Sequence, residues 1–211
     1  LSLGDNVAFC EYADDRGVMS RSGIKNITAD ASGYSQWALT VLNGVMSAGI
    51  VGFPYGRTGL LPDDIAGQVS ADDRLMAKYL QLEASMPVAR ISFAPWHIKD
   101  RDLYDAVKRF INFRSGLSTY IQTLVEESGL MGEPLVRHLE YQFPKQGFTD
   151  CDDQFMLGAK YLFAPNLDGG TKRMIRLPKG VWTDANGKRF KGPVVTEATG
   201  EMIWFELVSN K

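Results

Sequence analysis

The hydrophobic pattern of this chain changes near residue 132, and this change constrains the fold more than any other feature. Before it, stretches with helical spacing of apolar residues alternate with short β-branched runs. After it, short strand-like runs are separated by turn signals such as Asn186-Gly187, and no helical period persists. The pattern predicts an α/β half over residues 1–132 and an antiparallel β domain, a β-sandwich, over residues 133–211.

The first half contains candidate helices and candidate strands. Apolar spacing predicts three helices, the last one broken near Gly116, over residues 37–48, 72–86 and 102–127. The β-branched runs 49–53 and 88–93 predict buried strands. Because strands that alternate with helices imply parallel βαβ units, we expect the C-terminal strands and helices of a (β/α)8 barrel. In such a barrel the chemistry lies on the loops that follow the strands.

Charge and length exclude several classes of protein. The 211 residues carry 23 Lys and Arg against 25 Asp and Glu, a formal net charge of −2. This balance gives no reason to expect nucleic acid or an anionic membrane as a partner. No apolar run approaches the roughly 20 residues of a membrane span. The chain starts at Leu1 in an apolar stretch without a signal-like lead-in, which we interpret as a chain cut out of a longer one.

The cysteines and one glycosylation pattern bear on the compartment. Cys10 and Cys151 are the only cysteines, and their spacing does not fit a metal site. They are either bridged to each other, free, or paired with another chain. Asn26-Ile27-Thr28 is an N-glycosylation acceptor pattern, which is used in the secretory pathway. We therefore expect a secreted glycoprotein or one of the secretory lumen, with Asn26 as the acceptor.

Polar and aromatic side chains lie at or after the predicted strands. Asp30 precedes the first predicted helix, and Asp63 follows the run 49–53. Arg90 and Ser92 lie in the second run, and Trp96 follows it. Glycosidases use one carboxyl group as general acid and another as nucleophile or base. Together with an aromatic side chain that can stack on a pyranose ring, this set suits a sugar site.

Each of these residues also has an ordinary structural interpretation. Asp30 can cap the helix that follows it, Asp63 can lie in a solvated turn, and Trp96 can serve packing. The only histidines, His97 and His138, support neither a catalytic triad nor a metal cluster. No cofactor is predicted.

Several segments, taken in order, resemble glycoside hydrolase family 31. Gly52-Phe53-Pro54-Tyr55 with Leu61-Pro62-Asp63-Asp64-Ile65-Ala66-Gly67 resembles the family's loop after barrel strand seven. Further segments resemble the next helix, strand eight and the C-terminal β domain, at residues 79–87, 90–96, 132–139, 153–158, 163–165 and 177–182. Within the family, the chain is most similar to an α-galactosidase-like branch that includes the myogenesis-regulating glycosidase.

The resemblance implies roles for the candidate residues. The family's acid/base aspartate precedes the strand-seven glycine by the distance that separates Asp30 from Gly52, 22 residues. Asp5 stands in the family's usual Gly-Asp-Asn wording, but it lies 47 residues before Gly52 and is the second candidate. The resemblance places further residues in the substrate pocket, namely Asp63, Arg90, Ser92 and Trp96.

The resemblance also implies an incomplete active site. Family members hydrolyse α-glycosidic bonds with retention, and the substrate here would be an α-galactoside or an α-glucoside. The nucleophile and the earlier barrel strands would come from an N-terminal chain of the same precursor or from a related subunit. Two departures from the family favour an alternative: Ser92 stands where most members have a histidine, and Gly56 to Gly59 form an insertion. The alternative is a catalytically inactive relative that is a sugar-binding or structural subunit of an extracellular assembly.

Overall fold

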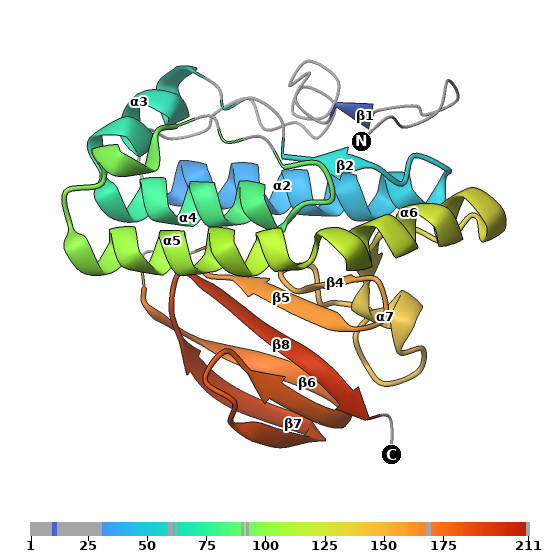
Figure 1. Ribbon diagram of the computed structural model, residues 1–211. Coiled ribbons are helices and arrows are strands. Elements are labelled where there is room, and N and C mark those ends of the chain that lie inside the picture. Colours follow the sequence, from blue (N-terminus) through green and yellow to red (C-terminus); the bar gives the residue numbers. More distant parts are fainter. Residues whose placement is uncertain are drawn as a thin grey trace.

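The computed structural model describes residues 10–11, 31–58, 61, 63–89, 91, 93–167 and 170–209. A layer of helices packs on an antiparallel sheet (Figure 1). The helices, with one 3-10 turn, are α2 Ala31–Ile50, α3 Asp63–Ala71, α4 Asp73–Ser85, η1 Pro95–His97, α5 Arg101–Gly116, α6 Ser118–Met131 and α7 Leu139–Gln142. The strands are β1 Cys10–Glu11, β2 Gly56–Arg57, β3 Val136–His138, β4 Phe155–Leu157, β5 Tyr161–Pro165, β6 Lys172–Asp184, β7 Arg189–Thr199 and β8 Met202–Ser209.

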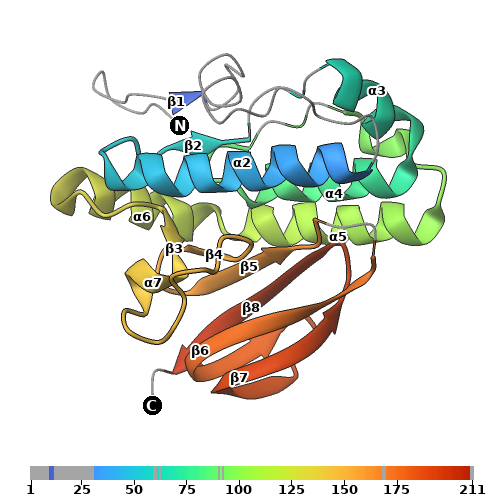
Figure 2. The same ribbon diagram turned by 180° about the vertical axis from the view of Figure 1, so that it is seen from behind.

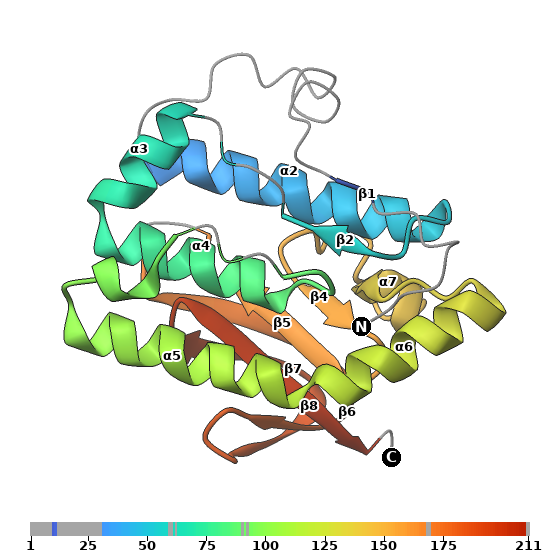
Figure 3. The ribbon, with the colours of Figure 1, turned by 45° about the horizontal axis from the view of Figure 1, so that its top comes forward.

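The three helices predicted from periodicity are present. The carboxylate of Asp72 caps α4 by accepting from the N–H groups of Arg74 and Leu75 at 2.8 and 3.0 Å. The break in the last helix falls at Leu117, between α5 and α6. Figure 3 shows α2, α4 and α5 side by side in one layer. The outer helices of this layer each expose one face, whereas α4 is buried from Met76 to Ser85.

The predicted strand over residues 49–53 is wrong. Helix α2 continues through Ile50, and the N–H of Phe53 donates to the carbonyl of Ala48 at 2.8 Å. Gly52 has a φ of 97°, the left-handed conformation that closes a helix C-terminus. Val51 is 72% exposed, so this β-branched run ends a helix instead of forming a buried strand.

The predicted strand over residues 88–93 is also absent among the residues described there, which are 88, 89, 91 and 93. The guanidinium of Arg114 in α5 donates to the carbonyls of Met86 and Pro87 at 3.3 and 2.9 Å. These carbonyls therefore bind a side chain rather than a neighbouring strand. Asp63, expected in a loop, is the first residue of α3.

The sheet has the strand order β3-β4-β5-β8-β6-β7, and every neighbouring pair is antiparallel. The predicted antiparallel sheet is therefore present, but it is a single sheet covered by helices rather than two sheets of a sandwich. The expected barrel portion is not present in the described part of the chain. There, parallel pairing is confined to the two-residue strands β1 and β2.

Alternation along the strands divides the core into two clusters. Phe155, Leu157 and Phe163 face the helices, whereas Met156 and Leu162 belong to the cluster on the opposite face of the sheet. Figure 2 shows α7 and its loop beside the sheet, away from the helical layer. Leu139, Phe143, Phe148 and Cys151 from this segment cover the opposite face.

Candidate functional site

Most of the predicted site residues lie outside the described residues: Asp5, Asn26, Asp30, Arg90 and Ser92. Their roles stay predictions. Helix α2 begins at Ala31, the residue after Asp30. Asp63 is described by its backbone only, as the first residue of α3.

Trp96 is the predicted site residue whose side chain is described. It lies in η1, where Pro95 fixes the backbone at the first position, and it is 75% exposed. The ring of His97 meets it edge-on at 6.3 Å between centroids. A large aromatic side chain with this exposure does not serve core packing.

The segment that carries Trp96 is held at both ends. Arg114 binds the carbonyls at its start, as described above. At its end, the carboxylate of Asp73 accepts from the N–H groups of Lys99 and Asp100 at 2.8 and 2.7 Å. Between them, Phe93 packs edge-on against Tyr79 at 5.5 Å. These contacts fix the position of the exposed ring relative to α4 and α5.

Charged residues that the sequence did not single out lie buried between α4 and the sheet. Glu201, in the turn between β7 and β8, is 8% exposed, and Lys78 of α4 is 2% exposed. The carboxylate of Glu201 lies 3.8 Å from the ammonium of Lys78 and 3.3 Å from the guanidinium of Arg74. Burial raises the pKa of Glu201, and the two cations oppose this rise.

A second buried pair lies one turn along α4. The hydroxyl of Tyr79 donates to the carboxylate of Glu83 at 2.8 Å, and both side chains are buried. The nearby Tyr34 of α2 is fully buried, and burial first and then Tyr79, Glu83 and Glu201 raise its pKa well above the ordinary value. The apolar pattern of α4 did not predict that these charged side chains are buried, because it is typical of an amphipathic helix whose charged side chains face the solvent.

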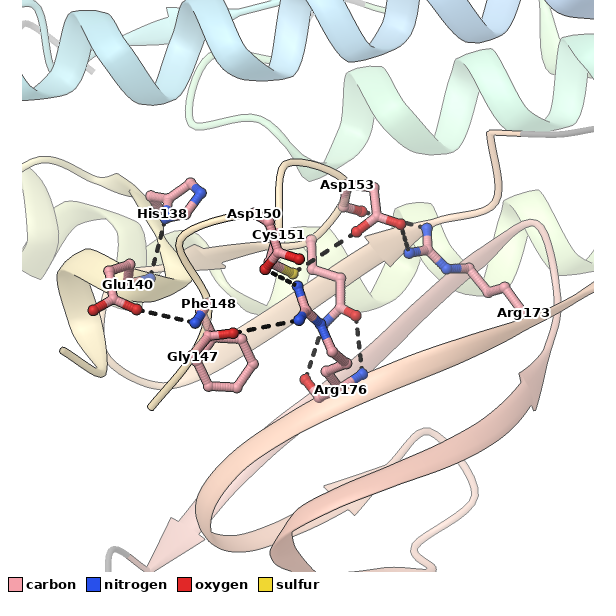
Figure 4. A network of polar contacts seen from close by, with 10 residues as sticks. His138, Glu140, Gly147, Phe148, Asp150, Cys151, Asp153, Arg173 and Arg176 are labelled. Carbon is pink, nitrogen blue, oxygen red and sulfur yellow. Dashed lines mark hydrogen bonds and ion pairs between the residues drawn. The ribbon is translucent and has the colours of Figure 1, made fainter. Parts of the chain in front are cut away.

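A third polar cluster secures the loop after α7 (Figure 4). The carboxylate of Glu140 accepts from the N–H groups of Lys145 and Phe148 at 2.7 and 3.0 Å. These two hydrogen bonds lower the pKa of Glu140. The ring of His138 accepts from the N–H of Glu140 at 3.1 Å. His138 and Glu140 thus shape the loop and the helix start.

Two arginines of β6 bind the same loop. Arg176 lies 3.1 Å from the carboxylate of Asp150 and 5.5 Å from the ring centroid of Phe148. Arg173 forms an ion pair with Asp153. These contacts connect the segment before β4 to the long strand β6 (Figure 4). We assign this cluster a structural role, because its arginines and acids bind one another or the backbone of the same fold.

Cys151 is a free, buried thiol within this loop. Burial raises the pKa of Cys151, and a buried thiol with a raised pKa is a poor nucleophile. Among the residues that the structure describes, no group of three or more His, Cys, Asp or Glu side chains could hold a metal ion. No helix in that same part of the chain is long and apolar enough to cross a membrane.

Comparison with known proteins identifies the sheet region. Residues 132–206 match the model of the glycosyl hydrolase family 31 C-terminal domain. The chain carries a family 31 C-terminal domain. This match confirms the resemblance predicted from the sequence.

Relatives and solved structures agree with this family 31 assignment. The myogenesis-regulating glycosidase of Mus musculus is 27% identical over 179 residues, which are 77% of this chain and 24% of the relative. An alpha-glucosidase of Saccharolobus solfataricus is 28% identical over 61% of this chain and 20% of its own length. The chain therefore spans about a quarter or less of the length of these relatives.

The fold matches as well. The crystal structure of a GH31 alpha-xylosidase from a soil metagenome, complexed with xylose, superposes with a TM-score of 0.69 at 21% identity. The match covers 87% of this chain and 31% of that one. At this identity the likeness shows the fold alone and no substrate.

Proposed function

We propose that this chain is part of a retaining α-glycosidase and acts together with a further segment or subunit that carries the nucleophile. The observation that carries the proposal is the family 31 match over residues 132–206, combined with relatives that are glycosidases. The substrate would be an α-glucoside or an α-galactoside, and the protein would travel the secretory route with Asn26 glycosylated.

In this proposal Asp30 is the general acid and base. The partner's carboxylate attacks the anomeric carbon while Asp30 protonates the leaving oxygen, and water then hydrolyses the glycosyl-enzyme with Asp30 as the base. The two carboxyl groups would stand roughly 5–5.5 Å apart, as in other retaining enzymes. Trp96, exposed on its anchored segment, would contact the sugar ring.

One observation favours a second candidate function. The insertion that separates this chain from the family contains Gly56 and Arg57, which form β2 and pair with β1. Together with Ser92 in place of the family's histidine, this departure supports an inactive relative that binds sugar or serves as a structural subunit.

The test uses the Asp30→Asn variant of the complete protein with its partner. Turnover of an aryl α-glucoside with a poor leaving group should fall by orders of magnitude, because that oxygen needs a proton to leave. An α-glucosyl fluoride, whose leaving group needs no proton, should lose far less in its first step. Unchanged rates on both substrates would exclude Asp30 as the acid and leave Asp5 or an inactive relative as the better hypothesis. If the wild-type assembly binds sugars without hydrolysing any α-glycoside, the inactive relative is the better description.

A further inference from the structure

The sheet divides between β6 and β8. Strand β8 pairs with β5 from Met202 to Glu206, but it pairs with β6 only from Phe205 onward. Met202, Ile203 and Trp204 therefore have a neighbouring strand on one side only. All three residues line a cavity of about 350 Å³.

The ribbon formed by β6 and β7 closes this cavity. Asp184, Asn186 and Lys188 from the turn between the two strands line it, and so do residues 197–199 at the end of β7. The turn and the end of β7 lie at opposite ends of the ribbon. The ribbon must therefore curl back on itself, and the register shift within the β6–β7 pairing is the kind of irregularity that bends a strand. Figure 1 shows this curled ribbon on the side of the sheet away from the helices.

The lining of the cavity is apolar at its base and polar at its opening. Ile203 and Phe205 are buried, and the ring of Phe190 meets that of Phe205 edge-on at 5.5 Å. The polar residues of the lining, by contrast, are exposed or half-buried, namely Asp184, Asn186, Lys188, Glu197 and Thr199. An aromatic base with hydrogen-bonding groups around it is typical of sites for small ligands.

The charges of the lining disfavour an ionic ligand. The ammonium of Lys188 lies over the ring of Phe190 at 4.9 Å, and the carboxylate of Glu197 pairs with Lys172 at 3.0 Å. The carboxylate of Asp184 accepts from the N–H groups of Asn186 and Lys188, both at 2.9 Å. Charged groups of both signs line the opening, and each already contacts another group of the protein. A neutral ligand with hydroxyl groups therefore fits this opening better than a ligand with a net charge.

We propose that this cavity is a non-catalytic carbohydrate site that takes one or two pyranose rings. A pyranose has an apolar C–H face, which suits the partly buried ring of Phe190 above the buried Phe205, and a periphery of hydroxyl groups, which suits the polar opening. The volume lies at the lower end of the range for small-molecule sites, which suits a ligand of this size. The proposal does not depend on hydrolysis, because binding here requires none of the catalytic carboxylates.

Hydrogen–deuterium exchange of the intact protein with maltose at millimolar concentrations tests this proposal. Maltose should protect peptides that cover residues 184–190 and 197–205, independently of any protection near Trp96. The Thr199→Trp variant, which fills the cavity, should lose this protection. The Asn186→Ala variant should need a higher maltose concentration for the same protection. This substitution keeps the backbone N–H of residue 186, so the hydrogen bond to Asp184 that holds the turn can still form. Gln122→Ala, on the exposed side of α6, is the matched control and should behave as wild type.

Protection of peptides near Trp96 alone would support the catalytic proposal and overturn this one. Protection of residues 184–205 in a protein without hydrolytic activity would support the carbohydrate site and not the glycosidase. Wild-type protection in folded Thr199→Trp would overturn the assignment to this cavity, and so would the absence of protection in the wild type.

Discussion

At the scale of single residues, the most informative feature is the set of charges buried between α4 and the turn that precedes β8. Glu201 reaches from the sheet to Lys78 and Arg74 on the helix, and its backbone carbonyl accepts from the N–H of Asn166 at 2.9 Å. Burying a carboxylate is costly unless cations accompany it. The ion pairs therefore connect the sheet to the helical layer, and the two cations offset the cost of burying the carboxylate of Glu201.

Glu201 makes a component of the stability depend on pH. Since burial raises its pKa, the native state holds the proton more tightly than the unfolded state does. Stability from this group is fully present below the ordinary glutamate pKa and is lost as pH rises through the raised value. Glu201→Gln lacks this component, so its free energy of unfolding minus that of the wild type should increase with pH across this window. Urea unfolding at several pH values measures the difference.

The exposed pair between Lys172 and Glu197 provides the control for this measurement. Glu197→Gln removes a solvated carboxylate of the same sheet, and the loss of this exposed ion pair should change the free energy of unfolding by less than about 1 kcal/mol. A difference for Glu201→Gln that is flat or decreases as pH rises would contradict the account of Glu201.

Arg114 is a second residue with a specific structural effect. It donates to two carbonyls at the start of the segment that carries Trp96. Hydrogen bonds from a charged group are worth about 1.5–3 kcal/mol, so Arg114→Ala should lower the free energy of unfolding by about this amount. Arg109→Ala, exposed on the same helix, should change it by less than about 0.5 kcal/mol. Equal effects of the two substitutions in denaturant unfolding would show that the contact contributes nothing.

At the scale of elements, a stacked aromatic pair is among several ring contacts that join α5 to the sheet. The rings of Phe113 and Trp204 lie 3.9 Å apart between centroids, with 11° between their planes. Stacked aromatic pairs contribute about 0.5–1.5 kcal/mol beyond their buried area. A double-mutant cycle with Phe113→Ala and Trp204→Ala should show a coupling of this size. Phe113 and Phe143 lie in different core clusters, so the losses of unfolding free energy caused by Phe113→Ala and Phe143→Ala should add in the double variant.

The sequence predicted the long helices but not α3, and it predicted two strands wrongly, for physical reasons that differ. Helical periodicity is a local signal, and it located α2, α4 and the break between α5 and α6. The runs 49–53 and 88–93 are too short for periodicity to separate a strand from the end of a helix or a bent segment. The conformation of Gly52 ends helix α2 in the first run, and Arg114 binds the carbonyl just before the second run. The contact of Arg114 joins residues far apart in the chain, so neither run alone could have predicted it.

The candidate site was predictable only in part for a related reason. Spacing and family resemblance indicated Asp30 and Trp96, and the exposure of Trp96 agrees with a surface role. The buried Lys78 and Glu201 are 123 residues apart in the chain. Their pairing arises from the packing of α4 on the sheet, so no local pattern could have predicted it.

At the scale of the whole molecule, one end of the helical layer carries a cluster of exposed apolar side chains. Figures 1 and 3 show α2 and α6 ending on the same side. Gly49 packs so closely on Pro134 that a Cβ at Gly49 would lie 2.7 Å from it. The residues around this contact are exposed by 44–87%, namely Ile50, Val51, Phe53, Leu130 and Met131. Clusters of this kind mark contact surfaces.

We expect this apolar end to contact the remainder of the proposed glycosidase, because the chain spans only 24% of its mouse relative. The 211-residue chain expressed by itself should therefore self-associate, because water would otherwise contact this surface. Replacing Val51 and Leu130 together by Ser should reduce the association in light scattering over a range of concentrations. Val195→Ser, which removes another exposed valine, in β7, should leave it unchanged. A wild-type chain that stays a 23.4 kDa monomer at every concentration would contradict this expectation.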